Sequence, residues 1–251
     1  MSIFQRPQGV PVYKTNPIIF GLIVLNTVVF IYTRIVGMNT MQDFYNLGAL
    51  NGHWVVEGGQ WWRVVTVMFL HGDILHFAFN TFFGLFVLGA ALERILGSLK
   101  FALVYFGGGI LASWAVVVWD VFTETMVPTV GASGAIFAVL GVLLFLTINR
   151  SHWFNPRDAS SIKGLVLINV VFTFMSPNIS IPGHLGGLAA GYIIAMIFNF
   201  DTPQTSKRAK DFENPFERSY MDPGNLDDID DVEVVDDKND DDDPFSKYDD
   251  L

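Results

Sequence analysis

The sequence predicts an all-α membrane protein, with a bundle of six transmembrane helices followed by a disordered acidic tail. Hydrophobic residues make up 51% of the 251 residues and charged residues only 16%, whereas a soluble domain carries about 25% charged residues. Residues 1–200 contain 9 basic residues (Lys and Arg) and 7 acidic residues (Asp and Glu), whereas residues 201–251 contain 6 basic and 18 acidic residues. We therefore expect a cytoplasmic N-terminal segment (1–16), a six-helix domain (17–200) and a cytoplasmic acidic tail (201–251).

Long apolar runs are the second observation, because a helix needs about 20 apolar residues to cross a bilayer. Five runs approach this length: 17–36, 72–95, 101–119, 130–148 and 179–200. A sixth run, 162–175, is short and by itself could be a re-entrant segment. The first run lacks a small-residue cleavage site after it, so we interpret it as a membrane helix and not as a signal peptide.

Loop charge, the third observation, predicts that residues 162–175 also cross the membrane. Basic residues gather at the N-terminus and in every second loop: Arg6 and Lys14; Arg94 and Lys100; Arg150, Arg157 and Lys163; Lys207, Arg208 and Lys210. The loops between them, 38–70, 120–129 and 176–183, contain a single Lys or Arg residue, Arg63. Cytoplasmic loops are rich in Lys and Arg. The pattern therefore predicts a multi-pass protein of the cell membrane with both termini in the cytoplasm.

The end of the chain has a different composition. Residues 211–251 are rich in Asp, with an unbroken acidic run at 240–243, and contain few apolar residues. Such a segment cannot bury enough surface to fold. We expect it to be disordered, and binding to a cytoplasmic partner or to a basic ligand stays open. No nucleic-acid partner is expected.

Polar side chains inside the spans are functional candidates, because each is costly in lipid. The apolar body offers few: His71, His76, Asn80, Ser133 and His184. In the predicted topology, spans two, four and six run from outside to inside. His76 and Asn80 lie one to two turns into span two, Ser133 opens span four and His184 lies one turn into span six. These four side chains therefore fall at one level, in the outer part of the bilayer.

Ser133 and His184 have the chemistry of an acyl-transfer pair, although each also has a structural interpretation. Ser133 follows Gly131 and Ala132 at the start of a helix, where free N–H groups and the positive dipole end suit an oxyanion. A serine among glycines is, however, usually a helix-packing site. His184 adjoins a smooth face of glycines at four-residue spacing, 183, 187 and 191, so its imidazole could reach a neighbouring helix. A lone membrane histidine is about equally often a structural hydrogen-bonding group.

His76 and Asn80 lie at i and i+4, on one face of span two. Both can donate hydrogen bonds, and two donors aimed at one point would stabilise a developing oxyanion. A metal site formed by His71, His76 and His184 is the competing interpretation. The five-residue spacing of the first two and the lack of a carboxylate at ligand spacing disfavour it. The sequence has no cysteine, which excludes thiolate zinc sites and a thiol nucleophile. We expect neither a metal nor a cofactor.

Five separated motifs follow one another along the chain: Trp62-Arg63; His71, His76 and Asn80; Glu93-Arg94-Ile95-Leu96-Gly97; Gly131-Ala132-Ser133-Gly134; and Gly183-His184 with Gly187 and Gly191. In this order they resemble the motifs of the rhomboid intramembrane proteases. The resemblance covers about residues 17–200. It implies a Ser133–His184 catalytic dyad and an oxyanion site formed by His76, Asn80 and backbone N–H groups near Ser133. Arg63, in the first-loop motif, is expected to be structural.

One position departs from the family pattern. Many relatives carry Tyr four residues after the nucleophile, packed on the catalytic imidazole, whereas this chain has Phe137. The ring can still stack there, without the phenolic hydroxyl. No buried Asp or Glu is available to orient His184, so the implied machinery is a Ser–His pair without the third, acidic residue.

Site and resemblance together predict an intramembrane serine endopeptidase that cuts single-span membrane proteins in or near their transmembrane segments. Its active site would open to the outer side, and the substrate would enter sideways past span five. A catalytically inactive relative that binds membrane clients is the alternative. A transporter or channel is a further rival, but it predicts polar groups along a whole path, and these groups cluster at one depth.

Overall fold

The computed structural model describes residue 4 and residues 10–37, 40–176 and 179–200. These residues are mostly helical, and their only β pairing is an isolated bridge between Leu50 and Thr129. The predicted acidic tail, residues 201–251, lies outside the described residues, as do most of residues 1–9.

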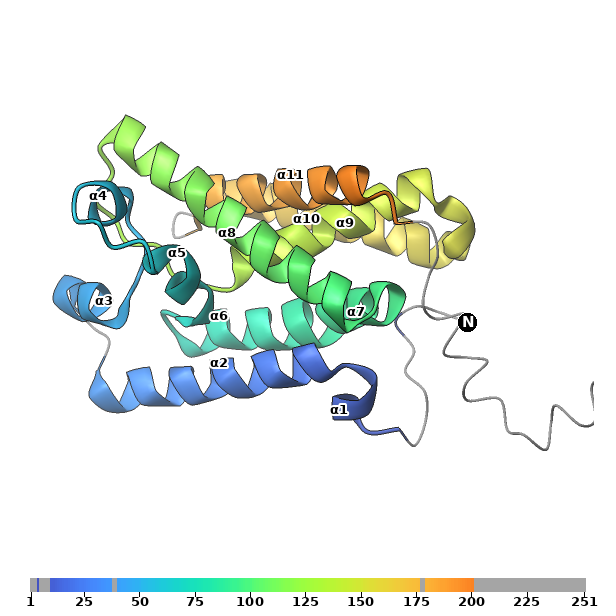
Figure 1. Ribbon diagram of the computed structural model, residues 1–251, viewed down its shortest axis with the longest axis horizontal. Coiled ribbons are helices and arrows are strands. Elements are labelled where there is room, and N and C mark those ends of the chain that lie inside the picture. Colours follow the sequence, from blue (N-terminus) through green and yellow to red (C-terminus); the bar gives the residue numbers. More distant parts are fainter. Residues whose placement is uncertain (1–3, 5–9, 38–39, 177–178, 201–251) are drawn as a thin grey trace, which may run out of the picture. The chain divides into compact units, whose positions relative to one another are not determined.

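Six apolar helical segments form the body of the protein (Figure 1). They are α2 (Pro17–Val36), the continuous segment α6–η2–α7 (Ile74–Leu96), α8 (Ser98–Thr123), α9 (Ser133–Asn149), α10 (Pro156–Met175) and α11 (Ile181–Phe198). Five are long and apolar enough to cross a membrane, and α9 is a shorter apolar helix. The predicted all-α fold class is therefore confirmed, and α2 has the predicted limits.

The fifth predicted span is a helix long enough to cross a membrane, but its predicted start was wrong. The segment expected at 162–175 is part of α10, which has 20 residues, whereas α9 has only 17. The side chain of Asn155 caps α10 by accepting a hydrogen bond from the Asp158 N–H at 2.8 Å, and Pro156 occupies the first turn. Polar residues of this first turn, such as Arg157, resemble a loop in the sequence and hid the true start of the helix.

The second span changes helix type along its length. Asp73 caps α6 (Ile74–Ala78) by accepting from the His76 N–H, and the chain then continues as the π-helical segment η2 (Phe79–Gly89) and as α7 (Ala90–Leu96). At the far end, the Glu93 carboxylate accepts hydrogen bonds from the N–H groups of Ile18 and Ile19, in the first turn of α2. The buried carboxylate thereby ties the first two spans together.

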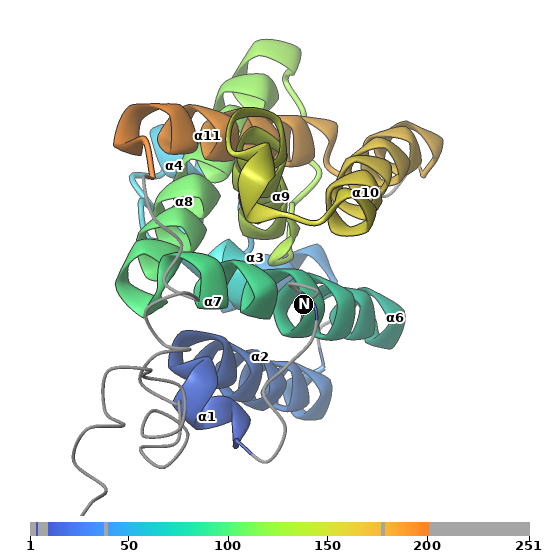
Figure 2. The ribbon, with the colours of Figure 1, turned by 90° about the vertical axis from the view of Figure 1, so that its right-hand side faces the viewer.

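Helix α9 lies at the centre of the bundle, in contact with α8, α10, α11 and η2 (Figure 2). It approaches α11 so closely that their backbones touch. A Cβ atom on Gly191 would collide with the Ala138 carbonyl oxygen, and one on Gly187 with the Gly134 carbonyl oxygen. The smooth face predicted from the glycine spacing is therefore confirmed for these two residues. Gly183 instead faces α8, where its Cβ would lie 3.2 Å from a methyl group of Val116.

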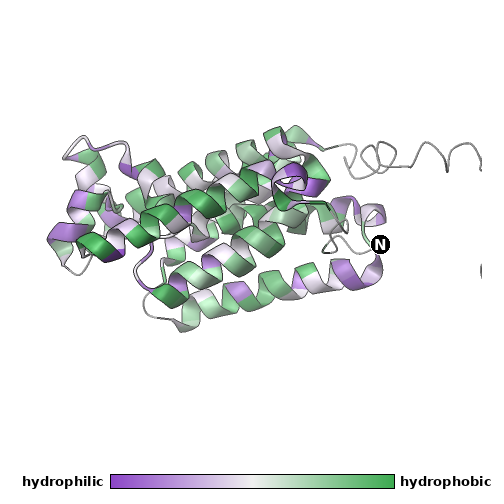
Figure 3. Cartoon of the chain, turned by 90° about the horizontal axis from the view of Figure 1, so that it is seen from below, coloured by the Kyte–Doolittle hydropathy of each residue, from purple (hydrophilic) through white to green (hydrophobic). Residues whose placement is uncertain are grey.

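Hydrophobic residues dominate the helices of the bundle (Figure 3), and many of them are exposed on its outer side. Large hydrophobic side chains are exposed on α2 and α10, among them Ile35, Leu167 and Phe174. Soluble monomers rarely expose apolar surface of this extent. The pattern is that of a bundle whose outer face is covered by lipid.

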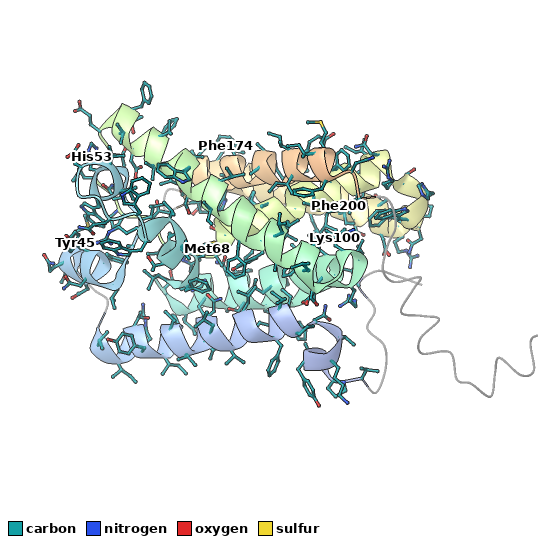
Figure 4. The ribbon with its side chains drawn as sticks, in the orientation of Figure 1. Tyr45, His53, Met68, Lys100, Phe174 and Phe200 are labelled. Carbon is teal, nitrogen blue, oxygen red and sulfur yellow. The ribbon has the colours of Figure 1, made fainter. Side chains whose placement is uncertain are left out.

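Charged and polar groups mark the two ends of the bundle (Figure 4). At one end, Lys100 lies 5.6 Å from the ring of Phe200, and Arg150 donates to Asn199. The other end carries the short helices of the first loop, and α6, α9 and α11 begin there (Figure 1). These short helices are α3 (Met41–Leu47), α4 (Gly52–Val56), α5 (Arg63–Thr66) and η1 (Val67–Phe69). The remaining elements are α1 (Val12–Thr15) and η3 (Ser151–Trp153).

Candidate active site

Ser133 is the first residue of α9, as the sequence predicted. Helix N-termini leave several N–H groups without partners inside the helix, and the dipole places partial positive charge there. Ser133 is partly exposed and lines a cavity of about 20 Å³, together with Met68, Ser113 and Gly183. That volume accommodates about one water molecule. The hydroxyl therefore lies beside the unpaired backbone N–H groups of the first turn of α9 and beside a cavity that can hold a small polar group.

His184 lies in the first turn of α11 and is buried. The ring of Phe137 stacks on its imidazole, with centroids 4.0 Å apart and planes 21° from parallel. On the ring edge, Nδ1 lies 2.9 Å from the Thr173 hydroxyl of α10. The imidazole thus packs against α9 on its face and contacts α10 at one edge. Its second nitrogen, Nε2, has no hydrogen-bond partner among the described residues.

Close contact between α9 and α11 places Ser133 and His184 in the same region of the bundle. Gly134, the residue after Ser133, lies near Gly183, the residue before His184: a Cβ on Gly134 would lie 3.6 Å from the Gly183 carbonyl oxygen. No hydrogen bond joins Ser133 and His184 in the part of the chain that the structure describes. Such bonds are often long in the absence of substrate and tighten in the reacting complex.

His76 lies next to the residues that lead into α9. Gly131 has a φ of +130°, and an ideal Cβ atom there would lie 2.7 Å from His76 Nε2 and 3.6 Å from Ser133 Oγ. The space left by the missing side chain of Gly131 thus adjoins both the imidazole and the hydroxyl, and a larger residue would collide with His76. Asn80 is buried, and its side-chain amide donates a 2.8 Å hydrogen bond to the His76 carbonyl oxygen. An amide has two N–H groups, so one remains for another acceptor.

His71 is fully buried beside His76, with ring centroids 5.2 Å apart. Burial, and secondarily the neighbouring His76, lower the pKa of His71 to about 3. Within the described ranges, no cluster of three or more His, Cys, Asp or Glu side chains could hold a metal ion. His71 therefore belongs to the packing behind His76, and the described residues offer no ligand set around it.

Arg63 makes only structural contacts in the first loop. It is buried, and its guanidinium donates to the carbonyl oxygens of Ala49 at 2.7 Å and Tyr45 at 2.8 Å. The same group lies over the rings of Tyr45 and Trp54. Burial lowers the pKa of Arg63 from its usual value. These contacts hold α3, α4 and α5 together, and Trp62 beside it is exposed.

The contact between Thr173 and His184 was missed in the sequence. The candidates predicted from the sequence were ionisable side chains, one serine and one amide, and no threonine was among them. A threonine in an apolar helix usually bonds its own backbone, so the residue type alone carries no signal. A hydroxyl in the last turn of span five, level with the other candidates, was the available hint.

Comparison with known proteins identifies relatives of this chain. The Rhomboid domain family matches residues 58–199. Rhomboid protease GluP of Bacillus subtilis is 35% identical over 194 residues, which cover 77% of this chain and 36% of that protein. The putative rhomboid protease YdcA of the same organism is 35% identical over 153 residues, covering 61% and 71%. Rhomboid-like protease 1 of Toxoplasma gondii is 34% identical over 153 residues, covering 58% and 50%.

The family match includes the last part of the first loop, from residue 58, and every helix from α6 to α11, with His76, Asn80, Ser133 and His184 among its residues. The chain spans only about a third of the length of GluP. On the strength of the domain match and of these relatives, the chain belongs to the rhomboid family.

Proposed function

We propose that the protein is an intramembrane serine endopeptidase, with Ser133 as nucleophile and His184 as general base. The observation that carries this proposal is the placement of Ser133 at the start of the central helix α9. That helix touches, backbone to backbone, the helix that carries His184. Since Nδ1 of His184 is engaged by Thr173, its Nε2 is the nitrogen left to accept the serine proton.

The chemistry follows the two-step course of serine hydrolases. The Ser133 oxygen attacks the scissile carbonyl carbon while His184 Nε2 takes the hydroxyl proton. The carbonyl oxygen becomes an oxyanion, stabilised by N–H groups of the first turn of α9, by the His76 imidazole and by the Asn80 amide. His184 then gives its proton to the leaving amine. A water molecule then attacks the acyl carbon and passes a proton to His184. The ester bond to Ser133 breaks, the carboxylic acid product leaves, and His184 returns its proton to the Ser133 oxygen.

The substrates would be single-span membrane proteins, cut in or near their transmembrane segments in the bilayer. The proposed domain is residues 17–200, with both termini in the cytoplasm and the active site opening to the outer side. Basic residues support this orientation, because Lys100 and Arg150 lie at the end of the bundle opposite to the starts of α9 and α11. The acidic tail, residues 201–251, would be a cytoplasmic disordered segment available to a soluble partner.

A cleavage assay in liposomes tests the proposal. We expect the intact protein to cut a single-span substrate, and Ser133→Ala and His184→Ala each to abolish cleavage. The double variant should lose no more than either single variant, because residues that act as one unit are not additive. Undiminished cleavage by Ser133→Ala would exclude this mechanism. An intact protein that binds such substrates and never cuts them would instead support the inactive client-binding alternative.

A further inference from the structure

The buried hydroxyl of Thr173, in the last turn of α10, contacts two groups at once. Its Oγ1 lies 2.8 Å from the backbone carbonyl oxygen of Asn169, one turn earlier, and 2.9 Å from Nδ1 of His184 on α11. Both distances lie in the range of ordinary hydrogen bonds. The direction of each bond decides which nitrogen of His184 carries a hydrogen.

A hydroxyl has one hydrogen to donate and lone pairs to accept with. The Asn169 carbonyl oxygen can only accept, so the Thr173 hydrogen points to it. The contact with His184 is then a hydrogen bond only if Nδ1 carries a hydrogen and donates it to Thr173 Oγ1. In a neutral imidazole with its hydrogen on Nδ1, the lone pair is on Nε2. The two distances together therefore select one tautomer of His184.

We propose that Thr173 is a positioning residue that holds His184 in the tautomer with Nδ1 protonated and Nε2 free to accept a proton. The proposal rests on the proposed function, in which His184 Nε2 takes the proton of Ser133. In serine proteases with three catalytic residues, a carboxylate fixes the tautomer and also stabilises the imidazolium. Thr173 supplies only the first of these two effects, because its hydroxyl is neutral.

A neutral partner suits this position in the molecule. A carboxylate at this depth would be a buried charge in the membrane, which is costly without a partner. The neutral hydroxyl needs no charged partner, and it donates its hydrogen to the Asn169 carbonyl oxygen. Phe137 packs on the face of the imidazole, so ring orientation and tautomer have separate determinants: α9 fixes the plane of the ring and α10 fixes its hydrogen.

The tautomer can be measured directly by NMR on the full-length protein with ¹⁵N-labelled histidine in detergent micelles. The chain has five histidines, and the His184 signal is identified by its absence in His184→Ala. We expect the wild-type spectrum to show His184 protonated at Nδ1. Wild-type His184 protonated at Nε2 would overturn the proposal without any variant of Thr173.

Two variants separate positioning from packing. Thr173→Val keeps the size of the side chain and removes the hydroxyl, and Thr173→Ser keeps the hydroxyl. Thr27→Val is the matched control, because Thr27 makes the same backbone bond, to Ile23 at 2.7 Å, on the distant helix α2. We expect Thr173→Val to populate the other tautomer and to lower kcat about tenfold, as for loss of one hydrogen bond, with little change in KM. Thr173→Ser and Thr27→Val should behave as wild type.

Ser133 should also react more slowly with a fluorophosphonate, a serine-specific probe, in Thr173→Val. In Thr173→Ser and Thr27→Val it should react at the wild-type rate. A lower melting temperature for Thr173→Val, with wild-type tautomer and kcat, would reduce Thr173 to a packing contact and overturn the proposal. Failure of the proposed function gives a different result. In that case the wild-type protein cleaves nothing and Ser133 is unreactive, whatever the tautomer of His184.

Discussion

Phe137 stacks on His184, and this contact joins the helix of the proposed nucleophile to that of the proposed base. The ring centroids are 4.0 Å apart, so the stack that the four-residue spacing from Ser133 allowed is confirmed. A stacked aromatic pair contributes about 0.5–1.5 kcal/mol beyond burial.

Replacing Phe137 tests what this stack does. Phe137→Tyr should retain activity, because the ring remains, whereas Phe137→Ala should lower kcat by up to about tenfold, since the imidazole loses its support. Phe145→Ala is the control, because Phe145 contacts Tyr192 across the same two helices away from His184. Steady-state cleavage rates per folded molecule give the comparison. Equal rates for Phe137→Ala and wild type would show that the stack does not position the base.

Asn80 is predicted to contribute to the oxyanion site. Asn80→Ala should slow turnover by about 10–1,000-fold while the protein stays folded, as for loss of one donor. His76→Ala should cost more, because His76 also packs between His71 and Gly131. Asn26→Ala serves as control, since Asn26 makes the same amide-to-backbone bond, to Leu22, on α2. If turnover by Asn80→Ala matched that of the control, Asn80 would be withdrawn from the site.

Gly191 is predicted to be essential for the contact between α9 and α11. In Gly191→Ala, the new methyl group meets the Ala138 carbonyl oxygen, so the two helices must separate. We expect a lower melting temperature in detergent and loss of cleavage. Gly107→Ala on α8 is the matched control: its Cβ would have no neighbour within 4 Å, and alanine favours a helix over glycine. Equal stability of the two variants would contradict the close packing described above.

Cleavage is predicted to be independent of metal ions. The mechanism needs only serine, histidine and hydrogen-bond donors, so incubation with EDTA should leave the rate unchanged. The rival site would combine His71, His76 and His184, with a spacing that does not suit zinc. Inhibition by EDTA that zinc specifically reverses would revive that alternative.

Deleting residues 211–251 is predicted to preserve folding and cleavage in a purified system. The segment is too acidic and too poor in apolar residues to build a core, and anionic lipid headgroups attract basic segments, not acidic ones. Rates of full-length and truncated protein on one substrate, with protease accessibility of the tail in oriented vesicles, provide the test. Loss of most activity, or a tail exposed on the same side as the active site, would contradict the prediction.

Features that follow from local pattern were predictable from the sequence. The limits of α2 follow from an apolar run after a proline, and Ser133 opens α9 because small residues precede a long apolar segment. Glycines four residues apart predicted that a neighbouring helix packs closely on one face of α11, because a face without side chains allows close approach by any helix.

Contacts between distant segments were not predictable in the same way. The start of α10 was misplaced because a first turn carrying Arg157 and Asp158 looks like a loop until its cap at Asn155 is seen. The bond between Thr173 and His184 depends on how α10 lies against α11, which no spacing in either helix encodes. The change to a π-helical segment after Ala78 likewise depends on the packing of span two.

The shortness of α9 sets the depth at which the proposed chemistry takes place. Its 17 residues reach about 26 Å at the usual rise of about 1.5 Å per residue, less than the roughly 30 Å thickness of the hydrocarbon layer. In the proposed orientation, with Arg150 at the inner boundary, the hydroxyl of Ser133 would lie several ångströms beneath the outer headgroups, and any tilt of the helix would place it deeper. A bilayer of different thickness would therefore alter how easily water reaches the nucleophile, with no change in the protein itself.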